Sequence, residues 1–179
     1  MRQQLYFIKK NELFLIAYIL LFLSACAFVF YFQGEKNLLY ADAISRLNIA
    51  RKIIDNITPG LAQVGNVWLP LPQLLMLPFI WNNYLWHSGI AGYFMSGTMY
   101  IIGGLFIYKT SKLINGSTIS SLFTLGIYAL NINVLYLQTT AMSESIFICS
   151  LSAAMYFFLL WYYSGKTSHL ILAALSVSM

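Results

Sequence analysis

Four uncharged apolar runs, each about as long as a membrane-spanning helix, constrain this chain more than any other feature. They cover residues 13–32, 89–108, 117–137 and 145–163. The hydrocarbon core of a bilayer is roughly 30 Å thick, which about 20 residues of helix cross, and in lipid only a helix or a closed barrel satisfies its own backbone. With 60% hydrophobic residues in 179, the chain also has more apolar surface than a soluble core of this size can bury. The sequence predicts an all-α, multi-pass integral membrane protein.

A fifth apolar run begins at Ser168 and is still apolar at Met179. It has no flanking cation and no C-cap residue, and it is too short to span a bilayer. We expect the sequence to stop inside a fifth helix, as the N-terminal part of a longer protein that would be inactive as a fragment.

The cations of the short loops indicate the orientation of the chain. They are Arg2, Lys9 and Lys10 before the first run, Lys109 and Lys112 after the second, and Lys166 after the fourth. Because cytoplasmic loops are enriched in Lys and Arg, we expect a cytoplasmic N-terminus, in the plasma membrane if the source is prokaryotic. Residues 34–87 and the cation-free loop near residues 138–143 then face the external side. The cations form no dense basic stripe, so we expect no nucleic acid as a partner.

The external segment holds an unusual share of the charge. Seven of the fifteen charged residues lie there: Glu35, Lys36, Asp42, Arg46, Arg51, Lys52 and Asp55. Ala43, Leu47, Ala50 and Ile54 recur at helical spacing, which predicts an amphipathic helix lying at the membrane surface. The stretch that follows is apolar, carries three prolines and is rich in Trp and Tyr, and it predicts a second interfacial helix.

Two acids, Asp42 and Glu144, are the candidate catalytic residues, because separate external segments bring them to the same membrane face. Simpler roles remain open for both. Asp42 is also placed to cap the helix or to pair with Arg46 four residues later, and Glu144 suits the positive end of a helix dipole. The cluster of Arg46, Arg51 and Lys52 is either a solvated face near lipid headgroups or a site for a specific anionic ligand.

The order of these features resembles the N-terminal part of the C-type glycosyltransferases. The shared features are one span, an external Asp near the start of an amphipathic helix in "YADAISRLNIAR", a Pro-Leu-rich interfacial helix, a span ending in Tyr-Lys, and an acid after the third span in "TTAMSES". The nearest groups are the protein O-mannosyltransferases and the lipid A aminoarabinose transferases. They take a sugar from a polyprenyl-phosphate carrier in the bilayer and transfer it to a protein, lipid or glycan acceptor.

The resemblance implies roles for individual residues. It implies that Asp42 acts as general base or organises the acceptor, and that Glu144 joins the same pocket, or in some members holds a divalent metal. Those families usually carry a Pro-Pro-Leu turn preceded by a Lys or His that meets the carrier phosphate, but this chain has Val67 and Trp68 there, with separated prolines. We therefore expect Arg46, Arg51 or Lys52, or a cation from the missing part of the protein, to meet the phosphate instead.

The expected reaction is attack of an acceptor hydroxyl on the anomeric carbon, with inversion. Two other classes of function stay open. A transporter or flippase usually has ionisable residues or broken helices near the middle of the bilayer, and the four apolar runs contain no charge. A noncatalytic membrane scaffold would require neither Asp42 nor Glu144.

Overall fold

The computed structural model describes residues 10–64 and 68–178, and within that part the fold is all-helical. Arg2, Lys9 and Val67, on which some of the sequence interpretation rests, lie outside the described residues. The α-helices are α1 (Lys10–Phe32), α2 (Ala41–Lys52), α3 (Leu71–Ile80), α4 (Asn83–His87), α5 (Ile90–Asn115), α6 (Thr118–Ala129), α7 (Ile132–Leu137), α8 (Glu144–Ser164) and α9 (Thr167–Val177), with the short 3₁₀ helices η1 (Lys36–Leu38) and η2 (Leu61–Gln63).

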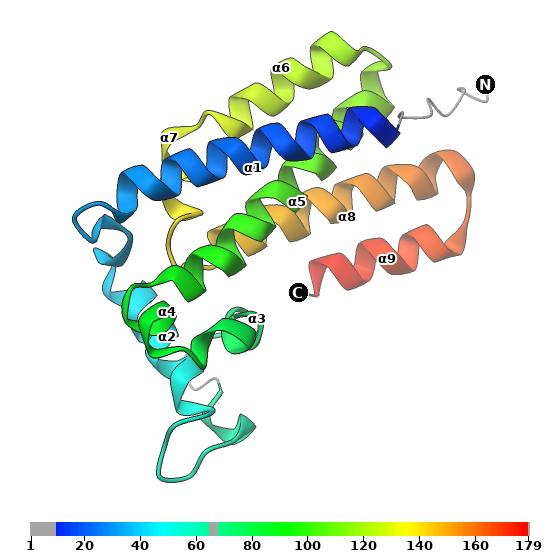
Figure 1. The fold of residues 1–179 in the computed structure, drawn as a ribbon. Helices are drawn as coiled ribbons and strands as arrows, with labels where there is room; N and C mark the ends of the chain where they lie inside the picture. Colours follow the sequence, from blue (N-terminus) through cyan, green and yellow to red (C-terminus); the bar gives the residue numbers. More distant parts are fainter. Residues whose placement is uncertain (1–9, 65–67, 179) are drawn as a thin grey trace.

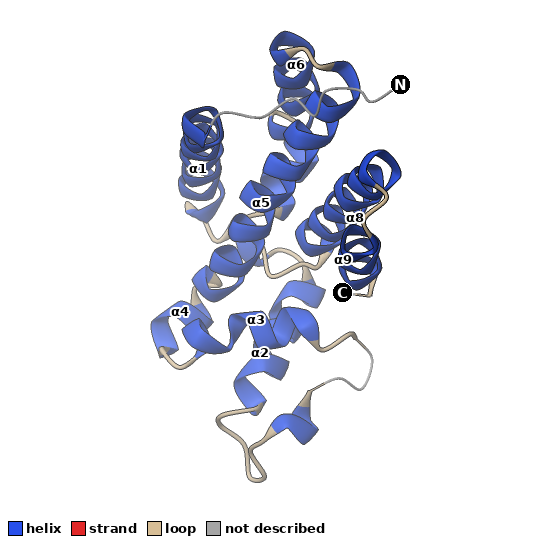
Figure 2. Cartoon of the chain, turned by 90° about the vertical axis from the view of Figure 1, so that its right-hand side faces the viewer, coloured by secondary structure: helices blue, strands red, loops and turns tan. Residues whose placement is uncertain are grey.

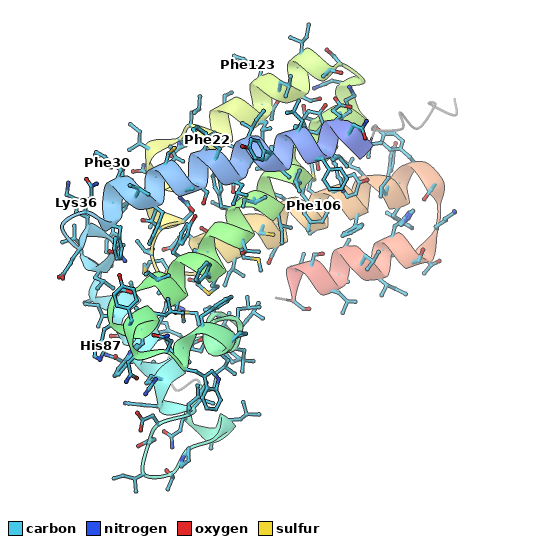
Figure 3. All side chains as sticks on the ribbon, viewed as in Figure 1. Phe22, Phe30, Lys36, His87, Phe106 and Phe123 are labelled. Atoms are coloured by element: carbon cyan, nitrogen blue, oxygen red, sulfur yellow. The ribbon has the colours of Figure 1, made fainter. Side chains whose placement is uncertain are left out.

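Three helices in the described part are long and apolar enough to cross a membrane: Asn11–Phe32 within α1, α5 and α8. The prediction of a membrane protein built from helices is confirmed. α5 lies in the middle, with α1 and α6 along one side and α8 along the other, and α9 folds back on α8 (Figure 1). Exposed aromatic side chains, among them Phe22, Phe30 and Phe123, cover the outside of α1 and α6 (Figure 3).

Glycines let α5 pack closely against its neighbours. A Cβ at Gly103 would lie 3.2 Å from Cα of Cys149 on α8, and a Cβ at Gly104 would lie 2.7 Å from Cδ1 of Leu20 on α1. Small residues at helix contacts are typical of membrane proteins, in which helix association depends on close packing.

α5 extends to Asn115, beyond the end predicted at residue 108, so Lys109 and Lys112 lie on the helix and not in a loop after it. The side chain of Lys112 is buried, and its Nζ lies 3.7 Å from Oε1 of Glu12 on α1 and donates to Oγ1 of Thr118. This cation therefore ties three helices together at one end of the bundle.

The predicted third span, residues 117–137, is wrong as a single helix, because the structure divides it into α6 and α7. Oδ1 of Asn131 accepts from the backbone N–H groups of Asn133 at 3.0 Å and Val134 at 3.2 Å, and so caps a new helix. The hydroxyl of Tyr100 donates to the carbonyl of Ala129 at 2.9 Å, which satisfies a group that the break leaves free. A capping Asn adds no charge to the run, so the absence of charge alone predicts continuity.

The segment between the first two spanning helices folds into α2, α3 and α4 and covers one end of α5, which we call the α2 end (Figure 2). A buried cluster joins α2 and α3 to α5 and α8: Ala43, Leu47, Ala50, Met76, Ile80, Ala91, Met95, Ala141 and Ile146. Ile54 packs against it. The residues of the stripe predicted from helical spacing are therefore the buried face of α2, but this face packs against the protein and not against the membrane, as a surface helix would.

Candidate functional site at the α2 end

Asp42 lies in the first turn of α2 with an exposed carboxylate. The N-cap position belongs to Tyr40, so Asp42 does not cap the helix, and its carboxylate makes no ion pair or hydrogen bond within the described residues. Asp42 therefore neither caps the helix nor pairs with Arg46, the two simpler roles that the sequence left open. The carboxylate is free to accept a proton from a bound molecule, at a helix end where negative charge is favoured.

Arg46 lies one helical turn beyond Asp42. It does not belong to a solvated face of the helix, which was one of the two alternatives that the sequence left open. Its side chain is only 7% exposed, and its guanidinium carbon lies 5.0 Å from the centroid of the Trp68 ring. Nε is buried and has no hydrogen-bond partner in the described part of the chain. By spacing, Arg46 lies three residues after Ala43 and four before Ala50, so it belongs to the buried side of α2.

The buried guanidinium borders a cavity of about 490 Å³ between α2, α3, α8 and α9. The walls are mostly apolar, and the polar side chains from α8 and its N-cap are those of Ser143 and Ser150. The lining residues are Arg46, Trp68, Leu69, Pro72, Ser143, Ile146, Phe147, Ser150, Leu151 and Val177. Arg46 is the cation among these lining residues. Because a buried charge without a counter-ion is costly, the cavity favours an anionic ligand with an apolar part.

Glu144 begins α8, directly after Ser143 of the cavity wall. Its Oε2 is buried and has no hydrogen-bond partner among the described residues. Such an atom is available to accept a hydrogen bond from a ligand or from a group that moves on binding.

The loop before Glu144 is held deep between α1 and α5. Gln138 is fully buried: its Oε1 accepts from Oγ of Ser24 at 2.7 Å and its Nε2 donates to the carbonyl of Ser24 at 3.3 Å. Oγ of Ser96 donates to the carbonyl of Met142 at 3.1 Å. These bonds fix the start of α8 and therefore the backbone position of Glu144.

Asp42 and Glu144 come to the same end of the bundle, as predicted from their segments. Asp42 directly precedes Ala43, and Glu144 lies two residues before Ile146, and both apolar residues belong to the cluster at the α2 end. Each acid therefore lies next in sequence, or nearly so, to a residue of this buried cluster.

Arg51 has a different environment from Arg46. It pairs with Asp55 at 3.0 Å, as its i,i+4 spacing suggests, and its Nη1 donates to the carbonyls of Ile80 at 2.9 Å and Trp81 at 3.1 Å. Its guanidinium carbon lies 4.9 Å from the ring centroid of Trp86. These contacts give Arg51 a structural role in docking α2 on α3 and α4, so it has few donors left for a phosphate.

Lys52 is exposed and makes no ion pair within residues 10–64 or 68–178. Its role as a phosphate contact stays a prediction. Of the three cations in the cluster, Arg46 is the one that borders the cavity.

In the part of the chain that the structure describes, no group of three or more His, Cys, Asp or Glu side chains comes together. Mg²⁺ is usually held by one or two carboxylates together with substrate phosphate and water, and Asp42 and Glu144 are the acids that the α2 end offers. The reaction proposed below is written without a metal.

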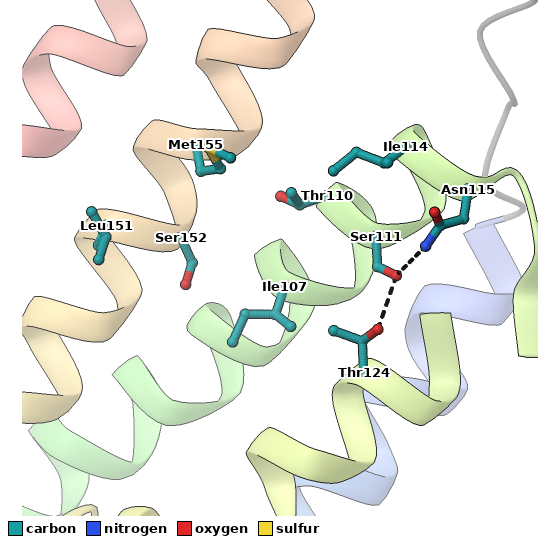
Figure 4. A pocket seen from close by; sticks show the side chains of 9 residues that line it. All are labelled: Ile107, Thr110, Ser111, Ile114, Asn115, Thr124, Leu151, Ser152 and Met155. Carbon is teal, nitrogen blue, oxygen red and sulfur yellow. Dashed lines mark hydrogen bonds between the residues drawn. The ribbon is translucent and has the colours of Figure 1, made fainter. Parts of the chain in front are cut away.

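A second cavity, of about 420 Å³, lies between α5, α6 and α8 (Figure 4). Three of its polar side chains pair with each other: Nδ2 of Asn115 donates to Oγ of Ser111 at 3.4 Å, and that hydroxyl lies 3.2 Å from Oγ1 of Thr124. The buried Oγ1 of Thr110, which also lines the cavity, has no hydrogen-bond partner among the described residues. Its lining contains no acid or cation. It includes none of the residues predicted to act in catalysis or in phosphate binding.

Known proteins give no further guide to the site. No family model matches the chain, and no curated protein or solved structure does so either. Its function has to be argued from its own residues.

Sequence reasoning identified Asp42, Glu144 and Arg46 but not the other walls of the cavity. Trp68 comes from the segment before α3, while Ser143 and Ser150 both belong to the start of α8, and no local pattern links Trp68 to these two serines. For Arg46 a signal was present, since its spacing from Ala43 and Ala50 already placed it on the buried side of the helix.

Proposed function

We propose that this protein is a membrane glycosyltransferase that moves a sugar from a polyprenyl-phosphate carrier to an acceptor hydroxyl at the α2 end. One observation carries the proposal: the carboxylate of Asp42 and the buried guanidinium of Arg46, one helical turn apart, have no partner within the described residues, and Arg46 borders a largely apolar cavity. The resemblance to C-type glycosyltransferases adds the sugar carrier as the ligand that fits this combination.

The carrier phosphate is the proposed partner of Arg46. Arginine stays protonated in proteins, and its planar donors suit phosphate oxygens. A phosphate in the cavity would supply the counter-charge that Arg46 lacks, while Trp68 holds the guanidinium plane in place. A prenyl lipid keeps its phosphate at headgroup level, so the proposal places the α2 end at the external membrane surface.

The proposed reaction is a single displacement at the anomeric carbon. The acceptor oxygen forms its bond to that carbon while Asp42 takes the hydroxyl proton, and the bond from the carbon to the phosphate oxygen breaks. The phosphate leaves with the electron pair and is stabilised by Arg46, and the configuration at the anomeric carbon inverts. Residues four apart on a helix have Cβ atoms about 5–6 Å apart, which leaves room for the reacting atoms between base and cation.

The proposal requires Asp42 and Arg46 each to raise the rate of transfer by a large factor. A positioned general base contributes roughly 10²- to 10⁴-fold, and one well-placed group stabilising the developing charge contributes about 10²- to 10³-fold. Glu144 is proposed to accept a hydrogen bond from the acceptor or from a neighbouring side chain through its unpartnered Oε2.

The test compares transfer of labelled sugar from polyprenyl-phosphate sugars in membranes that contain the full-length protein. The variants are wild type, Asp42→Asn and, as a control just after the end of α2, Asp55→Asn, each at matched expression. We expect Asp42→Asn to lose at least 10²-fold in transfer and Asp55→Asn to stay near the wild type, because Arg51 is the partner of Asp55 within the described residues. Equal activity of Asp42→Asn and wild type would remove Asp42 as the base.

A transporter is the second candidate, and the break between α6 and α7 is the observation that favours it, because transporters often bind substrates at broken helices. Here the free carbonyl of Ala129 is taken by Tyr100, and α7 is capped by Asn131. The break therefore offers few free groups to an ion. Movement of a labelled lipid across vesicles without any sugar transfer would favour the transporter over the enzyme, and a protein with neither activity would be a scaffold.

A further inference from the structure

A hollow between α8 and α9 forms an apolar groove of about 350 Å³. Its lining residues are Leu151, Ala154, Met155, Phe158, Leu170, Ala173, Ala174 and Val177. The three alanines are short side chains among long ones, and they create the hollow. A groove of this kind suits a flexible hydrocarbon chain, because it offers apolar walls and no polar group that would need a partner.

The groove adjoins the cavity that Arg46 borders, since Leu151 and Val177 line both. Taken together, the two hollows extend from a buried cation at the α2 end to the apolar space between two helices, and we call this arrangement the path. An amphiphilic anion matches both ends of the path. A small soluble anion would leave the groove unused, and a neutral lipid would leave Arg46 without a counter-ion.

The path also has the direction expected of a lipid chain. With a rise of 1.5 Å per residue, Leu151 lies about 10 Å and Phe158 about 21 Å along α8 from Glu144. α8 is one of the helices able to span the membrane. A chain that enters beside Ser143 would thus descend along α8 to a depth past the middle of a roughly 30 Å hydrocarbon core.

We propose that the groove between α8 and α9 holds the prenyl chain of the carrier lipid whose phosphate meets Arg46. The inference rests on the proposed function, because it takes the ligand to be a prenyl phosphate. It adds the route of the chain and predicts selection for carrier length, which the chemistry at Asp42 does not require.

Binding of sugar-free prenyl phosphates to the purified full-length protein tests the route without depending on transfer. One ligand has ten isoprene units and reaches along the groove, and the other has a single unit and stays near Arg46. In the variant Ala174→Trp a large ring fills the groove, and Leu175→Trp is the control, since Leu175 is exposed and does not line it. Thermal unfolding of both variants checks that they fold.

We expect Ala174→Trp to lower the affinity for the long ligand at least tenfold and to change the affinity for the short ligand by no more than about twofold. Leu175→Trp should change neither affinity. Arg46→Gln should weaken both ligands. Equal binding of the long ligand to Ala174→Trp and Leu175→Trp would refute the proposal that the prenyl chain lies in the groove. Transfer by the wild type in that case would leave the proposed function standing, whereas the expected binding pattern without any transfer would uphold the groove and refute the enzyme.

Photocrosslinking gives a test that needs no variant. A ten-unit prenyl phosphate with a diazirine on its middle units should label the wild type on peptides covering residues 151–158 and 170–177. Labelling confined to the exposed apolar face of α1 would contradict the proposed route, because that face is where a chain dissolved in the surrounding bilayer would meet the protein.

Discussion

Gly92 offers the sharpest test of how the loop before Glu144 is positioned. A Cβ at this position would lie 2.5 Å from Cβ of Ala141, 2.7 Å from its Cα and 2.8 Å from its backbone nitrogen. None of these atoms is the end of a flexible side chain, so Gly92→Ala must move the loop and α5 apart by about 1 Å to reach an ordinary contact near 3.4 Å.

Two effects of the Gly92→Ala change oppose each other. Overpacking of this kind costs about 1–3 kcal/mol, while replacing a helical glycine by alanine gains up to about 1 kcal/mol of helix propensity, and less in the first turn, where Gly92 lies. Gly126 on α6 provides the matched control, because a Cβ there meets nothing within 4 Å. Gly126→Ala should therefore show the propensity gain alone, and the difference between the two variants isolates the contact with Ala141.

Unfolding by denaturant in detergent micelles measures this difference, and we expect Gly92→Ala to be about 1–3 kcal/mol less stable than Gly126→Ala. Sugar transfer should fall as well, since a misplacement of about 1 Å can cost about 10²-fold. Adding Ala141→Gly should restore part of the stability, because it removes one of the three close contacts. Equal stability and equal transfer of the two alanine variants would refute the docking of this loop against α5.

Three further changes test other parts of the account. Tyr100→Phe should cost about 1 kcal/mol in the same unfolding assay, because it leaves the carbonyl of Ala129 at the helix break without a donor; no change would contradict the pairing. Gln138→Ala should cost about 1–3 kcal/mol, since it unpairs buried groups, whereas Gln63→Ala should stay within about 0.5 kcal/mol, because the hydrogen bonds of Gln63 to Thr58 are exposed to solvent. Arg51→Lys should lower protection of α2 amides from hydrogen exchange, because lysine cannot reach two carbonyls and a carboxylate together; unchanged protection would argue against its docking role.

The sequence was sufficient for the class of fold because hydropathy and length are local properties. The uncharged runs identified α1, α5 and α8, and the spacing of Ala43, Leu47 and Ala50 identified the buried face of α2. The break at Asn131 was missed, because one capping side chain and a distant Tyr100 decide it. The end of α5 was misplaced since a lysine can lie on a helix when a distant acid, here Glu12, pairs with it.

The site was predictable in part. Acids are few in this chain, and Asp42 and Glu144 were predicted as site residues because two external segments bring them to the same membrane face; their role stays a prediction. The cavity was not predictable, because its walls come from α2, the segment before α3, α8 and α9, and only their packing brings Trp68 and Ser143 to Arg46. The different roles of Arg46 and Arg51 likewise depend on tertiary contacts that two similar residues five positions apart do not reveal.

The most direct test of the central claim follows the donor and the product of transfer together. Membranes containing the full-length protein are given a polyprenyl-phosphate sugar of known anomeric configuration, and the product configuration is read by NMR for wild type and for Asp42→Asn. The account predicts a product of inverted configuration from the wild type and at least 10²-fold less product from Asp42→Asn. A product of retained configuration, or the same yield from both proteins, would contradict a single displacement with Asp42 as its base.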